Sequence, residues 1–237
     1  MSGRTHLVTG AGSGIGAALV DRLHARGDAL ALLARSAERA AELEQRWPGS
    51  TTLVADLADP ASLEGLAGDL PDRLDSLVHS AGVVALGPVA EAPLGEWEHQ
   101  LAVNLLAPAV LTRLCLPALR ASRGTVVFVS SGQGLSASAS WAGYAASKHG
   151  LKALADSLRA EEAGHGVRVS SVYPGRTDTP MQEAVHAHEG KEYEPARWIR
   201  PQTVADAVLH VLDLPGDAQV RARPARPRGC AGGCAGG

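Results

Sequence analysis

The sequence has no long apolar segment and no large excess of charge of one sign. None of its runs reaches about 18 consecutive apolar residues, the length that a membrane-spanning helix requires. The N-terminus has no basic stretch followed by the apolar core of a signal peptide. The formal net charge of −3 gives no electrostatic reason to bind nucleic acid or an anionic membrane. We therefore expect a cytoplasmic protein without nucleic-acid or membrane partners.

Cysteine is also scarce, with Cys115 inside an expected helix and Cys230 and Cys234 in a glycine-rich C-terminus. An odd number of cysteines in this placement is typical of a reducing compartment. The two C-terminal cysteines, and the pair formed by His186 and His188, lack neighbouring ligands that would complete a metal site. We therefore predict no metal centre.

The chain of 237 residues is long enough for one large α/β domain and too short for two. Short runs rich in leucine or β-branched residues alternate with amphipathic stretches, a pattern that predicts repeated βα units and a parallel sheet. Strands are expected over 5–10, 29–35, 50–57, 76–82, 124–132 and 167–175. Helices are expected over 14–26, from 36, after 59, twice within 94–120, over 141–163 and over 201–214. Right-handed connections then give a doubly wound sheet with helices on both faces and ligands at the carboxyl ends of the strands.

The C-terminal region departs from this pattern. Prolines and arginines interrupt residues 217–237, and proline cannot donate to a sheet ladder. We therefore predict one domain over 1–216 and a divergent, flexible tail over 217–237. A last edge strand over 220–223 is expected to be weak or absent.

A glycine-rich turn follows the first expected strand and precedes a helix. Glycine allows a tight turn and a close approach to a pyrophosphate, while the helix N-terminus offers free N–H groups and a positive dipole end. A purely structural turn is the alternative. The motif Thr-Gly-x3-Gly-x-Gly resembles that of the short-chain dehydrogenase/reductase family, and the resemblance covers about 5–215. It implies a Rossmann-like fold and a nicotinamide cofactor held here by Thr9, Gly10, Ser13, Gly14, Ile15 and Gly16.

The second strand predicts which nicotinamide cofactor is used. NAD-using members of the family end this strand with an acidic residue, whereas this chain has Ala34 and then Arg35. A guanidinium can hold the 2′-phosphate of NADP(H) through two parallel hydrogen bonds. We therefore favour NADP(H); NAD(H) stays possible if Arg35 is only a solvated loop residue. The resemblance adds contacts to the adenosine half from Asp56, Leu57, Ser80, Ala81 and Gly82, and His79 is interpreted as a buried strand histidine rather than a catalytic one.

Tyr144 and Lys148 form an i, i+4 pair near the start of a helix, so both side chains lie on one face. A nearby ammonium is expected to lower the pKa of the phenol, which would then act as a general acid or base. The family resemblance adds Ser131, thirteen residues before Tyr144, with Ser130 as the alternative hydroxyl, and Asn104 as a residue of the proton relay. It also assigns contacts with the nicotinamide end, besides those of Tyr144 and Lys148, to Pro174, Gly175, Thr177 and Thr179.

The resemblance implies an NADP(H)-dependent oxidoreductase that moves a hydride between nicotinamide and a carbonyl or secondary alcohol. A catalytically idle NADP(H)-binding sensor is an alternative, which the complete Asn, Ser, Tyr and Lys set disfavours. Epimerisation or dehydration is a third possibility. The substrate is expected to be a small molecule covered by residues 176–200, and family habit implies a homodimer or homotetramer.

Overall fold

The computed structural model describes residues 3–225 and contains one parallel sheet in the order β3-β2-β1-β4-β5-β6-β7. Chain order reverses between β1 and β4, which places a crevice for ligands at the carboxyl ends of these strands. The predicted Rossmann-like doubly wound fold is therefore confirmed. The strands are β1 Thr5–Thr9, β2 Ala29–Ala34, β3 Thr51–Val54, β4 Ser76–His79, β5 Thr125–Val129, β6 Arg168–Pro174 and β7 Ala222–Ala225.

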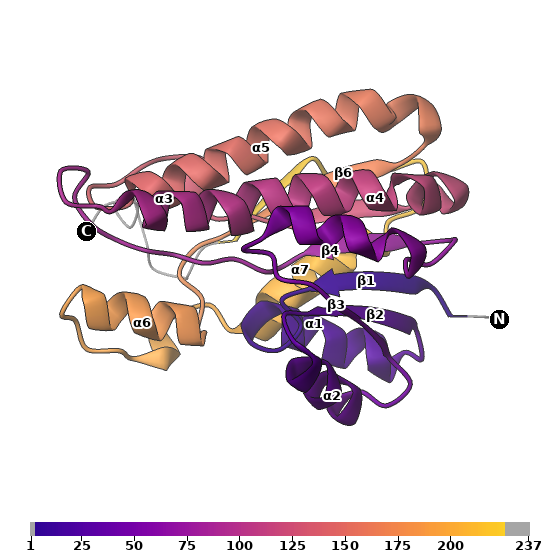
Figure 1. The fold of residues 1–237 in the computed structure, drawn as a ribbon, viewed down its shortest axis with the longest axis horizontal. Coiled ribbons are helices and arrows are strands. Elements are labelled where there is room, and N and C mark those ends of the chain that lie inside the picture. Colours follow the sequence, from indigo (N-terminus) through magenta and orange to yellow (C-terminus); the bar gives the residue numbers. More distant parts are fainter. Residues whose placement is uncertain (1–2, 226–237) are drawn as a thin grey trace.

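Helices cover both faces of the sheet, as Figure 1 shows. The α1, α2 and α7 helices enclose one apolar core with the side chains of β1 and β2, and α4 and α5 enclose a second core on the opposite face. Burying apolar side chains on both faces is what makes these strands nearly continuous hydrophobic runs. The helices are α1 Gly14–Ala25, α2 Ala37–Arg46, α3 Leu94–Leu101, α4 Ala107–Ser122, α5 Ala142–Glu162, α6 Pro180–His188 and α7 Pro201–Leu212.

Local sequence signals set the ends of several helices. Ser36 caps α2 by accepting a hydrogen bond from the backbone N–H of Arg39, and Thr179 caps α6 by accepting one from Gln182. A glycine at a positive φ of 75°, Gly27, follows the end of α1. These signals are short-range, which is why α1 and α2 begin where the sequence predicts them, whereas the bounds of α6 were not predicted.

The last strand is present, although it is short. β7 pairs in parallel with β6, with Ser171 opposite Ala222 and Pro174 opposite Ala225. Of the predicted alternatives, a weak or an absent edge strand, the structure has a short strand, and its bounds shift from 220–223 to Ala222–Ala225. A sheet edge tolerates proline since one side of the strand needs no ladder hydrogen bonds. The sheet thus extends beyond the expected domain boundary at 216, while Cys230 and Cys234 lie outside the described residues.

One continuous helical run, Leu94–Ser122, is long and apolar enough to cross a membrane by length and composition alone. Within the fold its α4 part places Leu111, Cys115 and Leu119 in the second core. The run is therefore a core helix of the α/β domain. Burial raises the pKa of the Cys115 thiol to about 12, so this cysteine stays protonated.

Candidate active site

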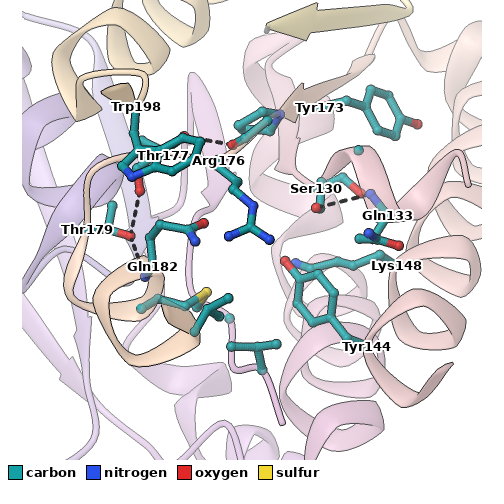
Figure 2. A pocket seen from close by; sticks show the side chains of 18 of the residues that line it. Ser130, Gln133, Tyr144, Lys148, Tyr173, Arg176, Thr177, Thr179, Gln182 and Trp198 are labelled. Carbon is teal, nitrogen blue, oxygen red and sulfur yellow. Dashed lines mark hydrogen bonds between the residues drawn. The ribbon is translucent and has the colours of Figure 1, made fainter. Parts of the chain in front are cut away.

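A cavity of about 810 Å³ opens at the carboxyl ends of β4, β5 and β6. The helices α5 and α6 bound it from two sides, and Figure 2 shows Tyr144 and Lys148 reaching into it from α5. Many of the residues predicted from the sequence line this one cavity, namely Ile15, Ser80, Ala81, Gly82, Ser131, Tyr144, Lys148, Pro174, Gly175, Thr177 and Thr179.

The glycine-rich turn packs so tightly that side chains are excluded from it. A Cβ on Gly16 would lie 2.1 Å from the carbonyl oxygen of Gly10, and a Cβ on Gly10 would lie 2.7 Å from the backbone nitrogen of Ala81. Gly10 also has a φ of 70°, which favours glycine. The turn therefore brings the backbone of β1 and the N-terminus of α1 close to the end of β4, as a pyrophosphate cradle requires.

Two polar residues of the turn have different roles. Thr9 is buried, and its hydroxyl accepts hydrogen bonds of 3.2 Å from the backbone N–H groups of Ser80 and Ala81. It therefore ties β1 to β4 and shapes the cradle from behind. Ser13 is the N-cap of α1 but makes no capping hydrogen bond through its side chain. Its hydroxyl thus stays available at the helix N-terminus, near Gly14, whose Cβ position lies 3.0 Å from a methyl group of Thr179.

A second arginine lies at the adenosine end of the site, and sequence reasoning missed it. Arg35 follows β2 and is exposed. The guanidinium of Arg39 lies over the glycine-rich turn, 2.4 Å from the position of a Cβ on Gly12, and is paired with Glu42. The signal was present in the sequence, because Arg39 lies in the first turn of the helix that Ser36 caps, four residues after Arg35.

The two residues expected to contact adenine, Asp56 and Leu57, lie at the end of β3, beside β2. Asp56 is exposed, and its carboxylate accepts a hydrogen bond of 2.9 Å from the backbone N–H of Ala58. Leu57 is partly buried against the core that α4 and α5 cover. The hydrogen bond fixes the turn after β3, which lies beside the end of β2, where Ala34 pairs with Val54.

The two side chains predicted to be catalytic on α5 are deeply buried. Tyr144 and Lys148 are 7% and 3% exposed, and the Lys148 ammonium lies 5.7 Å from the centre of the Tyr144 ring. Burial raises the pKa of Tyr144, while a hydrogen bond with Ser131 opposes this change. The expected lowering of the phenol pKa by Lys148 is therefore wrong for the free protein, because desolvation outweighs the favourable contacts. Burial also lowers the pKa of Lys148 to about 8.

The two candidate serines differ in their contacts. Ser131 makes the hydrogen bond with Tyr144, and its hydroxyl accepts another of 3.2 Å from the backbone N–H of Gln133. Ser130 is buried, and its hydroxyl has no hydrogen-bond partner among the residues that the structure describes. Since only Ser131 touches the phenol, the geometry favours it over Ser130.

Asn104 lies in a π-helical turn, Ala102–Leu106, that joins α3 to α4. Its side chain is fully buried, donates hydrogen bonds to Val83 and to the hydroxyl of Ser147, and accepts one from the backbone N–H of Val83. A Cβ on Gly82 would lie 3.2 Å from the amide oxygen of Asn104 and 3.4 Å from the ammonium of Lys148. Asn104 and Lys148 therefore meet beneath Gly82. The π turn, which often marks functional sites, was not predicted from the sequence.

The far wall of the cavity comes from residues 176–198, which belong to the segment expected to cover the substrate. Gln182 and His186 lie on α6, joined by hydrogen bonds of 2.9 Å, and the ring of His186 lies 5.0 Å from that of Trp198. His188 is exposed. In residues 3–225, no three His, Cys, Asp or Glu side chains gather in a way that could hold a metal ion.

His79 is buried in β4, stacked on Phe128 at 5.0 Å and hydrogen-bonded to Thr112 at 2.9 Å. Burial and the charge of Lys148 lower its pKa to about 3, so the imidazole is neutral. It lies in the second core beneath the site, which agrees with its interpretation as a buried strand histidine.

Comparison with known proteins identifies the family. Residues 4–190 match the family model described as short chain dehydrogenase. The chain belongs to the short-chain dehydrogenase/reductase family. It is therefore an oxidoreductase of the type that acts on CH–OH donors with a nicotinamide cofactor.

Several relatives of this family are similar over most of the chain. A 1-deoxy-11-beta-hydroxypentalenate dehydrogenase of Streptomyces exfoliatus is 39% identical over 200 residues, which cover 79% of this chain and 72% of the relative. An alcohol dehydrogenase of the archaeon Thermococcus sibiricus, solved with 5-hydroxy-NADP, is 26% identical, with a TM-score of 0.83 and coverage of 95% and 97%. A Beutenbergia cavernae protein solved with NADP at low occupancy is 34% identical, with a TM-score of 0.79 and coverage of 94% and 95%.

Proposed function

We propose that this oxidoreductase transfers a hydride between NADP(H) and a small carbonyl or secondary alcohol, with Tyr144 as the general acid and base. The observation that carries the proposal is the convergence of Tyr144, Ser131 and Lys148 in one cavity beside the glycine-rich turn. The Streptomyces relative supports the substrate class, because its name specifies a hydroxylated substrate.

The residues around the cavity fit a nicotinamide dinucleotide. The turn from Gly10 to Gly16 excludes side chains where a pyrophosphate would approach, and the buried hydroxyl of Ser80 has no hydrogen-bond partner among the described residues. When bound, NADPH supplies the hydride to the carbonyl carbon. The nicotinamide half would be held by Tyr144, Lys148, Pro174, Gly175, Thr177 and Thr179, and the rest by the turn, Asp56, Leu57, Ser80, Ala81 and Gly82.

Arg35 and Arg39 support NADP(H) over NAD(H). Both belong to the segment that leaves β2, and no carboxylate ends that strand to repel a 2′-phosphate. Glu42 already pairs with Arg39, and this contact orients the guanidinium over Gly12. A phosphate held by two guanidinium groups gains charge-assisted hydrogen bonds that NADH cannot make.

The proton chemistry follows from the burial of the site. Because its pKa is raised, the phenol of Tyr144 is protonated at neutral pH and can donate its proton to a carbonyl oxygen. Ser131, bonded to the same phenol, is placed to donate a hydrogen bond to that oxygen. Lys148, with a pKa of about 8, can return a proton to Tyr144, and Asn104 is held near the Lys148 ammonium by its hydrogen bonds with the backbone of Val83.

The test is loss of NADPH absorbance with a panel of ketones and aldehydes, with a cofactor-binding titration run in parallel. We expect turnover with at least one carbonyl and a lower KM for NADPH than for NADH. Tight NADPH binding without turnover would favour the sensor alternative, and product formation without net cofactor consumption would favour epimerisation or dehydration.

A further inference from the structure

The cavity wall opposite Tyr144 carries a cluster of charged side chains that the hydride transfer does not use. Arg176 follows Gly175 at the end of β6, and Figure 2 shows its guanidinium directed into the cavity. Glu189, at the end of α6, accepts two hydrogen bonds from this guanidinium, of 2.9 and 2.6 Å. The same carboxylate lies 3.3 Å from the ammonium of Lys191. The carboxylate of Glu189 thus forms ion pairs with two cations.

The cluster leaves an excess of positive charge at this wall. Both contacts lower the pKa of Glu189 against the effect of its burial, so the carboxylate is ionised and the three groups together carry one positive charge. The other charged groups that line the cavity are Glu192, which is exposed, Glu194, which pairs with Arg197, and Lys148. The lining therefore has no carboxylate in excess that would repel an anionic substrate.

Arg176 is held in place before any substrate arrives. Its guanidinium carbon lies 5.6 Å from the ring centre of Trp198, and its side chain is only 23% exposed. Trp198 in turn packs against His186, whose ring lies 5.0 Å away. A guanidinium held between a carboxylate and an aromatic ring loses little conformational freedom when an anion binds, and such preorganisation favours recognition of planar carboxylates.

We propose that Arg176, positioned by Glu189 and Trp198, binds the carboxylate of the substrate, and that the enzyme interconverts oxo acids and hydroxy acids. This inference rests on the function proposed above. In the reductive direction the carbonyl carbon gains a hydride from NADPH and its oxygen gains a proton from Tyr144, which gives the alcohol and NADP⁺. The carboxylate makes and breaks no bond, and serves only to orient the carbonyl toward Tyr144.

The first test compares oxo acids with their methyl esters. Pyruvate, levulinate and 5-oxohexanoate differ in the distance between carbonyl and carboxylate, and each ester removes the charge while keeping the carbonyl. We expect at least one acid in the series to have a kcat/KM about 10- to 100-fold above that of its ester, as loss of a charge-assisted hydrogen bond would predict. Equal values for every acid and ester would overturn the proposal.

Two variants separate substrate binding from a structural role of the ion cluster. Arg176→Gln is expected to remove the preference for acid over ester, while Arg176→Lys keeps part of it. Glu189→Gln removes a negative charge and should lower the KM for the acid. If the cluster only holds α6 in place, Arg176→Gln and Glu189→Gln will instead impair acid and ester equally.

Binding measurements distinguish failure of this inference from failure of the proposed function. NADPH affinity should be unchanged in Arg176→Gln, and a large loss would assign the guanidinium to the cofactor and refute the proposal. If no carbonyl is reduced, the proposed hydride transfer fails, but stabilisation of the NADP⁺ complex by levulinate, and not by its methyl ester, would still support the anion site. If no carbonyl is reduced and levulinate does not stabilise the NADP⁺ complex, the anion site is refuted as well.

Discussion

The contact between Gly10 and Gly16 allows a sharp prediction for the variant Gly16→Ala. The added Cβ would lie 2.1 Å from the carbonyl oxygen of Gly10 and 2.7 Å from its carbonyl carbon, and both are backbone atoms that cannot rotate away. Ordinary contact distances begin near 3.4 Å, so the turn must move by more than 1 Å. We expect a loss of about 1–3 kcal/mol of unfolding free energy from overpacking.

The larger effect should fall on the cofactor. A displacement of about 1 Å in a positioning element can cost on the order of 100-fold, so the Kd for NADPH should rise by about that factor. Tryptophan fluorescence quenching by NADPH measures the Kd, and urea unfolding measures the stability.

Gly65→Ala is the matched control, because a Cβ there meets nothing within 4 Å. This residue lies in the short helix Pro60–Gly68, on the chain between β3 and β4, and its variant should bind NADPH like the unaltered protein. Unchanged NADPH affinity in Gly16→Ala would refute the assignment of this turn as the pyrophosphate cradle.

Four further predictions follow from the site. Tyr144→Phe should lower kcat by at least about 100-fold with NADPH binding retained; near-normal turnover would overturn the assigned acid. Arg35→Asp and Arg39→Gln should each raise the KM for NADPH about tenfold or more without raising that for NADH, and parallel rises for both cofactors would contradict a 2′-phosphate site. The kcat/KM for reduction should fall as the pH rises through about 8, where Lys148 loses its proton. In Lys148→Arg this decrease of kcat/KM with pH should disappear. The pKa of His79 is lowered to about 3, so its contribution to stability is complete above a pH of about 6.5, the ordinary pKa of histidine, and is lost as the pH falls below that value, by up to about 1.4 kcal/mol per pH unit. Urea unfolding at several pH values should show that the free energy of unfolding of His79→Gln depends less steeply on pH.

The proposed catalytic set was accessible from the sequence by two routes. Tyr144 and Lys148 share a face whenever their segment is helical, whereas Ser131 and Asn104 were assigned through the resemblance to the family. The direction of the phenol pKa was not accessible, because it depends on how much of α5 is covered by the surrounding chain. Burial proved stronger than the hydrogen bond with Ser131.

The π turn around Asn104 could not be predicted from the sequence for a related reason. The extra residue of the π turn leaves the apolar pattern of the helix almost unchanged. The hydrophobic periodicity of the sequence therefore does not reveal the turn. Buried contacts with Val83 and Ser147 account for its stability, and these come from distant parts of the chain.

Taken alone, the sequence determined the order of strands and helices, the glycine-rich turn and the positions of the residues proposed for proton transfer, since each depends on neighbours a few residues away. The tertiary structure alone decided that β7 completes the sheet beside β6, and that Arg176, bonded to Glu189, lines the cavity. These features depend on packing between segments far apart in the chain or without a regular pattern, and no local preference encodes such contacts.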